Sequence, residues 1–216
     1  MNFPPDLVIF DCDGVLVDSE PLTNAVIRDN LARHGLDVPM QEVVRLFVGG
    51  TMMGVRDTAR GMGAALPDTW LEDVYDEIFD VLAREVEAIP GIETVLDVLE
   101  GAGIPVAVGS NGPHRKMEIT LGRTGLASRL EGLVFSREDV AQPKPAPDVY
   151  LKAAAAAGVA PDRAVVIEDS PSGARAALAA GIYCFGYVAQ TDPGRLEPVC
   201  DRLFDRMDDL PGLLGV

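Results

Sequence analysis

The sequence predicts an α/β fold in which a parallel, doubly wound sheet carries an all-helical insert after its first strand. Short apolar runs recur along the chain without alternating polar residues, as in strands buried on both faces. Helical segments separate the later runs, and several begin at or just after proline, which suits a first helical turn. The stretch from about residue 20 to 88 has no comparable apolar run and reads as helices only. We therefore expect two modules.

The individual elements follow from these patterns. The expected strands begin at Leu7 (LVIF), Val106 (VAV), Leu133 (LVF), Ala164 (AVVI) and Tyr183 (YCFGYV). The expected helices between the later strands span residues 92–99, 113–123, 147–157 and 171–180. The insert is expected to hold four helices, at 21–33, 41–47, 55–62 and 69–86. The predicted core therefore comprises residues 1–17 and 89–216, and the insert comprises residues 18–88.

The charge balance narrows the classes of partner. Among 216 residues, 18 are Lys or Arg and 34 are Asp or Glu, for a net charge of -16. Phosphate backbones and anionic lipid surfaces repel such a chain, so we expect neither nucleic acid nor membrane as a partner. The three cysteines form no CxxC motif and no signal peptide is visible, which favours the reducing cytoplasm. A monomer or weak homodimer is expected.

Polar residues gather where the predicted strands end. They are Asp11 and Asp13 after the first strand, Ser110 and Asn111 after the second, and Glu168 and Asp169 after AVVI. Lys144 stands among prolines in the segment QPKPAPD. Ligands of open parallel sheets bind outside the carboxyl ends of the strands. We therefore expect these side chains to meet in one crevice.

Electrostatics indicates what this crevice binds. Four carboxylates placed close together repel one another, and a divalent cation relieves the repulsion. Oxygen ligands without a histidine or cysteine cluster favour Mg²⁺ over zinc. Ser110 and Lys144 suit a phosphate group, and an aspartate that faces a phosphate can act as a nucleophile. A second acid two residues along the chain can protonate the leaving oxygen.

Four segments carry a resemblance to a known family. FDCDGVLVDSE, VGSNGP, PKPAPD and IEDSPSG resemble the four motifs of the haloacid-dehalogenase-like hydrolase superfamily. The match is to its beta-phosphoglucomutase-like and sugar-phosphatase branch, and it covers essentially the whole chain in the right order. The resemblance implies a Rossmann-like catalytic core and a four-helix cap at about residues 18–88.

The resemblance also implies roles for individual residues. Asp11 matches the nucleophile that forms an aspartyl-phosphate, and Asp13 matches the general acid and base. Ser110 and Lys144 match the phosphate anchors, and Asn111 is expected to contact substrate. The implied Mg²⁺ ligands are Asp11, the main-chain carbonyl of Asp13, Asp169 and Glu168, the last directly or through water.

Cap residues are expected to select the substrate. Gly49, Gly50 and Thr51 fit the cap loop that faces the core in this branch, and we expect them to contact the substrate. Arg45 and Arg56 flank that loop and could pair with a substrate carboxylate. The segment SNGP followed by Lys116 is similar to the sugar-acid phosphatases of the branch, including bacterial 6-phosphogluconate phosphatase.

Departures from the family patterns separate the possible reactions. Haloacid dehalogenases lack the second aspartate that Asp13 supplies, and phosphonate-cleaving members use a cap lysine, whereas residues 18–88 contain no lysine. The phosphomutases carry a cap histidine where Thr23 stands here. They also have basic residues where Val48 and Met52 stand. These differences favour a phosphatase, with a sugar phosphomutase as the alternative.

A non-enzymatic reading stays open beside the hydrolase. Receiver-type signalling modules also place phosphorylatable aspartates, a hydroxyl residue and a lysine at strand ends. The helical insert and the DxD spacing argue against such a binding module. The sequence thus predicts a Mg²⁺-dependent phosphatase that acts on a small phosphorylated metabolite.

Overall fold

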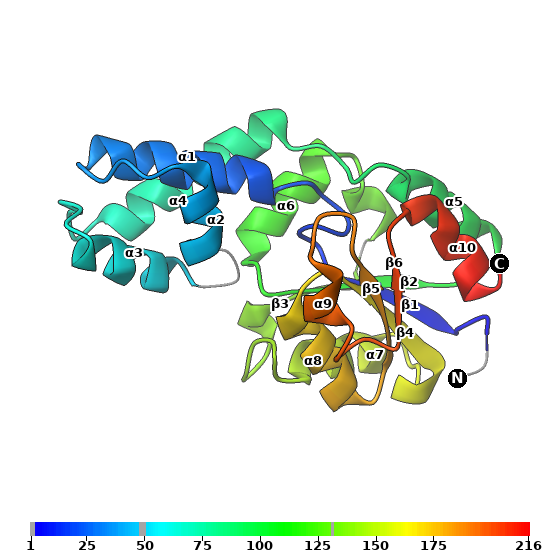
Figure 1. The fold of residues 1–216 in the computed structure, drawn as a ribbon. Coiled ribbons are helices and arrows are strands. Elements are labelled where there is room, and N and C mark those ends of the chain that lie inside the picture. The colour runs from blue at the N-terminus through cyan, green and yellow to red at the C-terminus, as the bar shows by residue number, and fades with distance from the viewer. Residues whose placement is uncertain (1–2, 48–50, 131) are drawn as a thin grey trace. The chain divides into compact units, whose positions relative to one another are not determined.

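The computed structural model describes residues 3–47, 51–130 and 132–216, and the chain divides into two compact units. One unit, here the core unit, comprises Met1–Asp18 and Glu87–Val216. The other, here the helical unit, is Ser19–Val86. Figure 1 shows the helices and strands along the chain.

The core unit is built on one six-stranded sheet. Its strands lie in the order β3-β2-β1-β4-β5-β6, and every neighbouring pair is parallel. The strands are β1 (Leu7–Phe10), β2 (Val106–Ser110), β3 (Val134–Ser136), β4 (Ala164–Glu168), β5 (Tyr183–Tyr187) and β6 (Arg202–Phe204). The chain adds β2 and β3 on one side of β1 and then β4, β5 and β6 on the other side, as in doubly wound sheets. The predicted α/β fold with a parallel sheet is confirmed.

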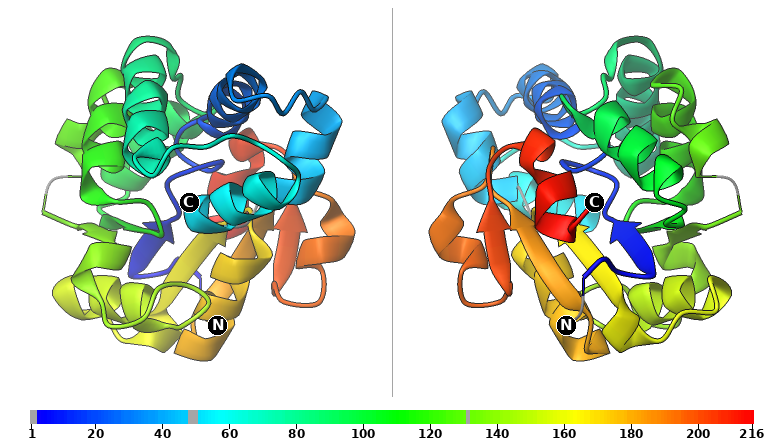
Figure 2. Two further views of the ribbon diagram at one scale, coloured as in Figure 1. Left: turned by 90° about the vertical axis from the view of Figure 1, so that its left-hand side faces the viewer. Right: turned by 90° about the vertical axis from the view of Figure 1, so that its right-hand side faces the viewer.

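Helices cover both faces of this sheet. On one face α7 (Asp148–Ala156) and α8 (Pro171–Ala180) pack their alanines against Leu7, Ile9 and Val166. Small side chains let these two helices approach the strands closely. The opposite face carries α5 (Ile92–Gly101), α6 (His114–Arg123) and α10 (Leu210–Leu214), as Figures 1 and 2 show.

The two central strands are buried along their whole length because they lie between these layers. All four residues of β1 and all five of β4 are buried. Continuous burial explains why their sequences are apolar without alternation. It also means that the polar residues at the strand ends are held by a rigid, buried sheet.

The helical unit contains α1 (Glu20–Arg33), α2 (Met40–Phe47), α3 (Met52–Gly61) and α4 (Trp70–Glu85). Its core includes Trp70, whose indole N–H donates to Asn30 Oδ1 over 2.6 Å. Asn30 in turn donates to Glu77. The unit therefore joins α1 to α4 through a buried polar contact as well as through apolar packing.

Several elements near the carboxyl end had no counterpart among the expected ones. They are α9 (Pro193–Leu196), β6, the 3₁₀ turn Met207–Asp209 and α10. Each is five residues or shorter, and too short for a helical or strand period to show in the sequence. No helix in the described ranges is long and apolar enough to cross a membrane.

Candidate active site

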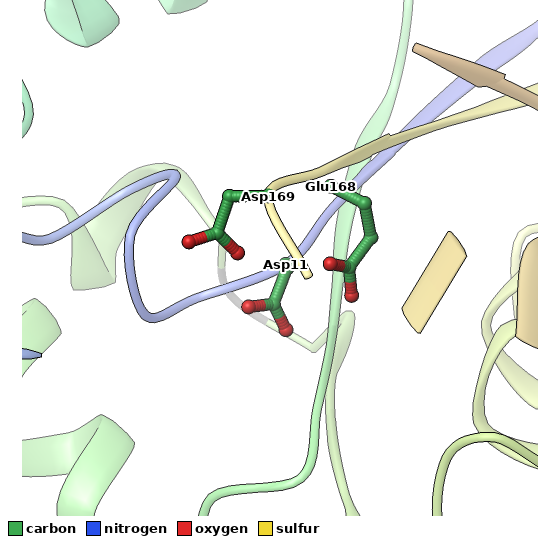
Figure 3. Close-up of side chains that lie close together, drawn as sticks. All are labelled: Asp11, Glu168 and Asp169. Atoms are coloured by element: carbon green, nitrogen blue, oxygen red, sulfur yellow. The ribbon is translucent and has the colours of Figure 1, made fainter. Parts of the chain in front are cut away.

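The carboxyl ends of β1, β2 and β4 bring the predicted polar residues to one edge of the sheet. Asp11 follows β1, while Ser110 and Glu168 are the last residues of β2 and β4. The register that pairs Phe10 with Ile167 on β4 sets Asp11 beside Glu168. Figure 3 shows Asp11, Glu168 and Asp169 converging. One carboxylate oxygen from each lies within 4.8 Å of the others.

Lys144 binds two of these carboxylates. Its Nζ donates to Asp11 Oδ1 over 2.6 Å and to Glu168 Oε1 over 2.7 Å. The lysine is 6% exposed, so the ion pairs lie in a dry environment. Burial acts to lower the pKa of Lys144, but Asp11 and Glu168 outweigh it and raise that pKa above its ordinary value. Lys144 therefore stays charged.

The pKa values of the two partners of Lys144 are shifted in opposite directions. Burial raises the pKa of Asp11 to about 7, although Lys144 opposes this shift. Burial acts in the same sense on Glu168, but Lys144 and further hydrogen bonds lower the pKa of that carboxyl. Asp11 is consequently the partner whose charge is most easily changed, and a second cation would hold it ionised.

Both oxygens of the buried Glu168 carboxylate accept hydrogen bonds. Oε1 accepts from Lys144 and from the Tyr150 hydroxyl, and Oε2 accepts from the main-chain N–H and the hydroxyl of Ser170. Gly173 on α8 leaves the room for this side chain, because a Cβ there would overlap Glu168 Oε1. Four protein donors thus fix Glu168 at the base of the site.

Asp169 is brought close to the loop that follows β1. Gly14 in that loop has φ of +79°, and a Cβ at this position would overlap Asp169 Oδ2. Both the positive φ and the lack of space favour glycine. The glycine of the DxDG sequence therefore lets the loop after β1 approach Asp169 at the end of β4.

Asp13 has a cationic partner that sequence reasoning did not assign to the site. Lys116 Nζ lies 2.8 Å from Asp13 Oδ1, and its side chain is 17% exposed. Burial acts to lower the pKa of Lys116, but the Asp13 carboxylate raises it. The signals in the sequence were the place of Lys116 at the start of the helix after Ser110 and the likeness of SNGP followed by Lys116 to sugar-acid phosphatases. The site thus contains two lysines.

The loop after β2 is hydrogen-bonded to the main chain of Lys144. Asn111 Nδ2 donates to the Lys144 carbonyl over 3.1 Å, and Asn111 Oδ1 accepts from the Lys144 N–H over 2.9 Å. Ser110 Oγ accepts from the Gly112 N–H over 2.9 Å. The structure thus gives Asn111, expected as a substrate contact, a role in holding Lys144.

The structure places the predicted cap residues within the helical unit. Arg45 makes a two-pronged ion pair with Glu42 on its own helix, and Arg56 pairs with the adjacent Asp57. Thr51 caps α3, where its hydroxyl accepts from the Gly54 N–H. The predicted substrate contacts Gly49 and Gly50, and Val48 beside them, lie outside the described residues. The Thr23 hydroxyl donates to the carbonyl of Ser19, the residue before α1.

The donor set at the sheet edge suits a hard divalent cation. Asp11, Glu168 and Asp169 offer carboxylate oxygens only, and the described part of the chain shows no other cluster of three such groups. Oxygen ligands select Mg²⁺ or Ca²⁺ over zinc or copper. Asp11 and Asp169 fit such an ion best, since the protein itself saturates Glu168.

Comparisons with known proteins identify the family. The family model described as haloacid dehalogenase-like hydrolase matches residues 5–181. The chain belongs to this family. Its members generally use a divalent metal, which agrees with the carboxylate cluster. The resemblance seen in the four motifs is therefore confirmed.

Relatives cover nearly the whole chain. 6-Phosphogluconate phosphatase of Escherichia coli (strain K12) is 30% identical over 96% of this chain and 94% of its own. Hexitol phosphatase A of the same strain is 33% identical over 88% of this chain and 87% of its own. A crystal structure of a haloacid dehalogenase family hydrolase from Deinococcus radiodurans R1, with bound phosphate and sodium, has a TM-score of 0.85. It is 31% identical and covers 99% of this chain and 96% of that one.

Proposed function

We propose that this protein is a Mg²⁺-dependent phosphatase that hydrolyses a small phosphorylated sugar or sugar acid through a phosphorylated Asp11. The buried Asp11–Lys144 pair at the end of β1 carries the proposal, because it joins a carboxylate nucleophile to a fixed cation. The phosphatase relatives support the same reaction class.

The first half of the reaction transfers the phosphoryl group. A carboxylate oxygen of Asp11 forms a bond to phosphorus, while the bond between phosphorus and the ester oxygen breaks. Asp13 donates a proton to the departing alcohol oxygen. Lys144 and Ser110 bind the phosphoryl oxygens, and the charge of Lys144 stabilises the negative charge that they carry.

The second half releases inorganic phosphate. Asp13, now a carboxylate, takes a proton from water, and the water oxygen bonds to phosphorus as the bond to Asp11 breaks. Lys116, in contact with Asp13, holds the carboxyl group that moves the proton in both halves. Positioning and charge supply most of the acceleration in phosphoryl transfer.

Asp11, Asp169 and the main-chain carbonyl of Asp13 would hold the Mg²⁺ ion. When bound, the ion offsets the repulsion between the carboxylates and the phosphoryl group. We assign Glu168 to the support of Lys144, since protein donors occupy both of its oxygens. This assignment replaces the expectation that Glu168 binds the metal directly or through water.

Substrate choice is assigned to the helical unit, Ser19–Val86, which corresponds to the cap expected at residues 18–88. Thr51 with Gly49 and Gly50 would contact the sugar, and Arg45 or Arg56 would exchange its acidic neighbour for a substrate carboxylate. The names of the relatives point to phosphorylated sugar acids and hexitols as the classes to test. We place the enzyme in the cytoplasm, where the three cysteines, free in the structure, stay reduced.

Phosphate release with Mg²⁺ across a panel of esters tests the proposal. The panel contains sugar phosphates, sugar-acid phosphates such as 6-phosphogluconate, hexitol phosphates, nucleotides and phosphoglycolate. We expect strong release from one sugar-derived class, and its loss with a chelator and recovery on adding Mg²⁺.

Two other outcomes would contradict the proposal. A β-sugar phosphate supplied with its bisphosphate, and isomerised without phosphate release, would show a phosphomutase. No turnover of any ester would move the binding-module alternative to the front.

A further inference from the structure

We propose that Tyr150 is a positioning residue that holds Lys144 and Glu168 in place for the reaction at Asp11. The inference rests on the proposed function and extends it to a residue on α7, outside the four motifs' polar positions. Tyr150 is wholly buried beneath the site. Its ring and its hydroxyl act on different members of the Lys144 cluster.

The ring lies against the lysine. Lys144 Nζ is 4.6 Å from the centre of the Tyr150 ring, within the range of a cation–π contact. Gly109 on β2 makes room for this ring, because a Cβ there would lie 2.9 and 3.0 Å from two ring carbons. The neighbouring strand thus has no side chain at the point where the aromatic ring supports the ammonium group.

The hydroxyl fixes the acceptor that Lys144 uses. Tyr150 Oη donates to Glu168 Oε1 over 2.8 Å, and the same oxygen accepts from Lys144 Nζ. Burial raises the pKa of Tyr150 well above its ordinary value, so the hydroxyl remains a donor. Gly173 closes the other side of Glu168. The glutamate therefore has a single defined position.

This arrangement matters when substrate arrives. Lys144 then shares its N–H donors between Asp11 and a phosphoryl oxygen, and its contact with Asp11 weakens. Glu168 and the Tyr150 ring are the contacts that keep the ammonium group in position through that exchange. A displacement of about 1 Å at such a group can cost about 100-fold in rate.

Tyr150→Phe is the direct test, because it keeps the ring and removes only the hydroxyl. On the best substrate of the wild-type enzyme we expect kcat to fall about 10- to 100-fold, while KM changes by less than about threefold. Tyr183→Phe is the matched control, since Tyr183 opens β5 at the far end of the strand from the site. It should leave kcat unchanged. Equal kcat in the wild type and Tyr150→Phe would overturn the proposal.

A double-variant cycle separates positioning from general loss of structure. If Tyr150 acts through Glu168, then Tyr150→Phe lowers kcat much less in a Glu168→Gln background than in the wild type. Effects that simply multiply would overturn the proposal. Thermal melting of all variants accompanies the cycle, and a folded Tyr150→Phe with low kcat is the expected combination.

Crystal structures of the wild type and Tyr150→Phe, both with Mg²⁺ and inorganic phosphate, test the placement without turnover. We expect the Lys144–Glu168 contact to lengthen or to split into two conformers in the variant. An unchanged Asp11–Lys144–Glu168 cluster would overturn the positioning role, even if the wild type hydrolysed no ester. Failure of the ester panel with a displaced Lys144 would instead reject only the proposed reaction.

Discussion

Lys144 in the core unit joins two carboxylates that come from different strands, and its partner Asp11 lies 133 residues away in the sequence. Arg45 in the helical unit pairs with Glu42, one turn earlier on the same helix, and both side chains are exposed. The two cations differ in everything that determines the strength of an ion pair: burial, the rigidity of the partners and screening by water.

This contrast separates an ion pair whose partners are fixed from one whose partners can be exchanged. Breaking a buried pair leaves a charge in a dry environment, so the Lys144 cluster holds its geometry. An exposed pair between neighbours is worth little, so Arg45 can give up Glu42 for another carboxylate at small cost. The rigid site suits a reaction common to many esters, and the helical unit suits the choice among them.

Asp11→Asn should produce the largest effect. Asparagine keeps the size of the side chain but removes the nucleophilic oxygen charge, so we expect phosphate release to fall by at least about 1,000-fold. Steady-state release from the best panel substrate measures it. Full Mg²⁺-dependent activity in the variant would show that another group attacks phosphorus.

Lys144→Met should be the most damaging change to stability among the site lysines. Asp11 and Glu168 would lose their shared cation while staying buried, which costs roughly 3–5 kcal/mol for such a pair. Urea unfolding measures this loss. The exposed Lys152, which donates to the Asp139 carbonyl, supplies the control Lys152→Met, for which we expect little change. Equal stability of the two variants would show that the buried cluster contributes nothing special.

Gly173→Ala tests the space beneath Glu168. The new methyl group overlaps Glu168 Oε1, so the glutamate or α8 must move, at a cost of about 1–3 kcal/mol and with lower kcat. Gly122→Ala, also in a helix but with no atom within 4 Å of the added Cβ, should instead be neutral or stabilising. Retention of full activity in Gly173→Ala would contradict the tight fit.

The raised pKa of Asp11, about 7, predicts a pH effect on the metal-free protein. The folded protein binds this proton more tightly than the unfolded chain does. The stabilisation from Asp11 is therefore complete below the ordinary carboxyl pKa and is lost as pH rises through about 7. Between pH 5 and pH 8, wild type should lose about 2–3 kcal/mol relative to Asp11→Asn in the presence of a chelator. A constant difference would show that Asp11 titrates normally.

Arg45→Ala should have the smallest effect on stability and a selective effect on substrates. Its melting temperature should match that of the wild type, because the pair with Glu42 is exposed. If Arg45 binds a substrate carboxylate, KM should rise for a sugar-acid phosphate but not for a neutral sugar phosphate. Arg28→Ala, which removes another arginine of the helical unit paired with its neighbour, is the control. A rise in KM for both substrate classes would reject this role.

The sheet and its helices could largely be predicted because their burial leaves a continuous apolar pattern. The run LVIF became β1 at the expected residues, and Pro171–Ala180 became α8 as expected. The strand β6 was missed because its three residues include the exposed Arg202 and carry no such pattern. Short edge elements depend on tertiary pairing rather than on local sequence.

Only the part of the site that lies at the ends of the strands could be predicted from the sequence. Parallel strands bring their carboxyl ends together, which is why Asp11 and Glu168 could be placed side by side from the sequence. The Lys116–Asp13 pair depends on how α6 packs, and the hydrogen bonds of Tyr150 depend on the ring sitting over Gly109. Neither follows from residue type or spacing, since a lysine or tyrosine on a helix is most often just surface or core.

The central claim is that Asp11 carries the phosphoryl group during turnover. The most direct measurement is acid quenching of the enzyme during the first turnover of its best substrate, followed by mass spectrometry of the peptides. The account predicts a phosphoryl group on the peptide that contains Asp11, and its absence in Asp11→Asn. A phosphoryl group on another residue, or rapid release with no phosphorylated peptide at any time, would contradict it.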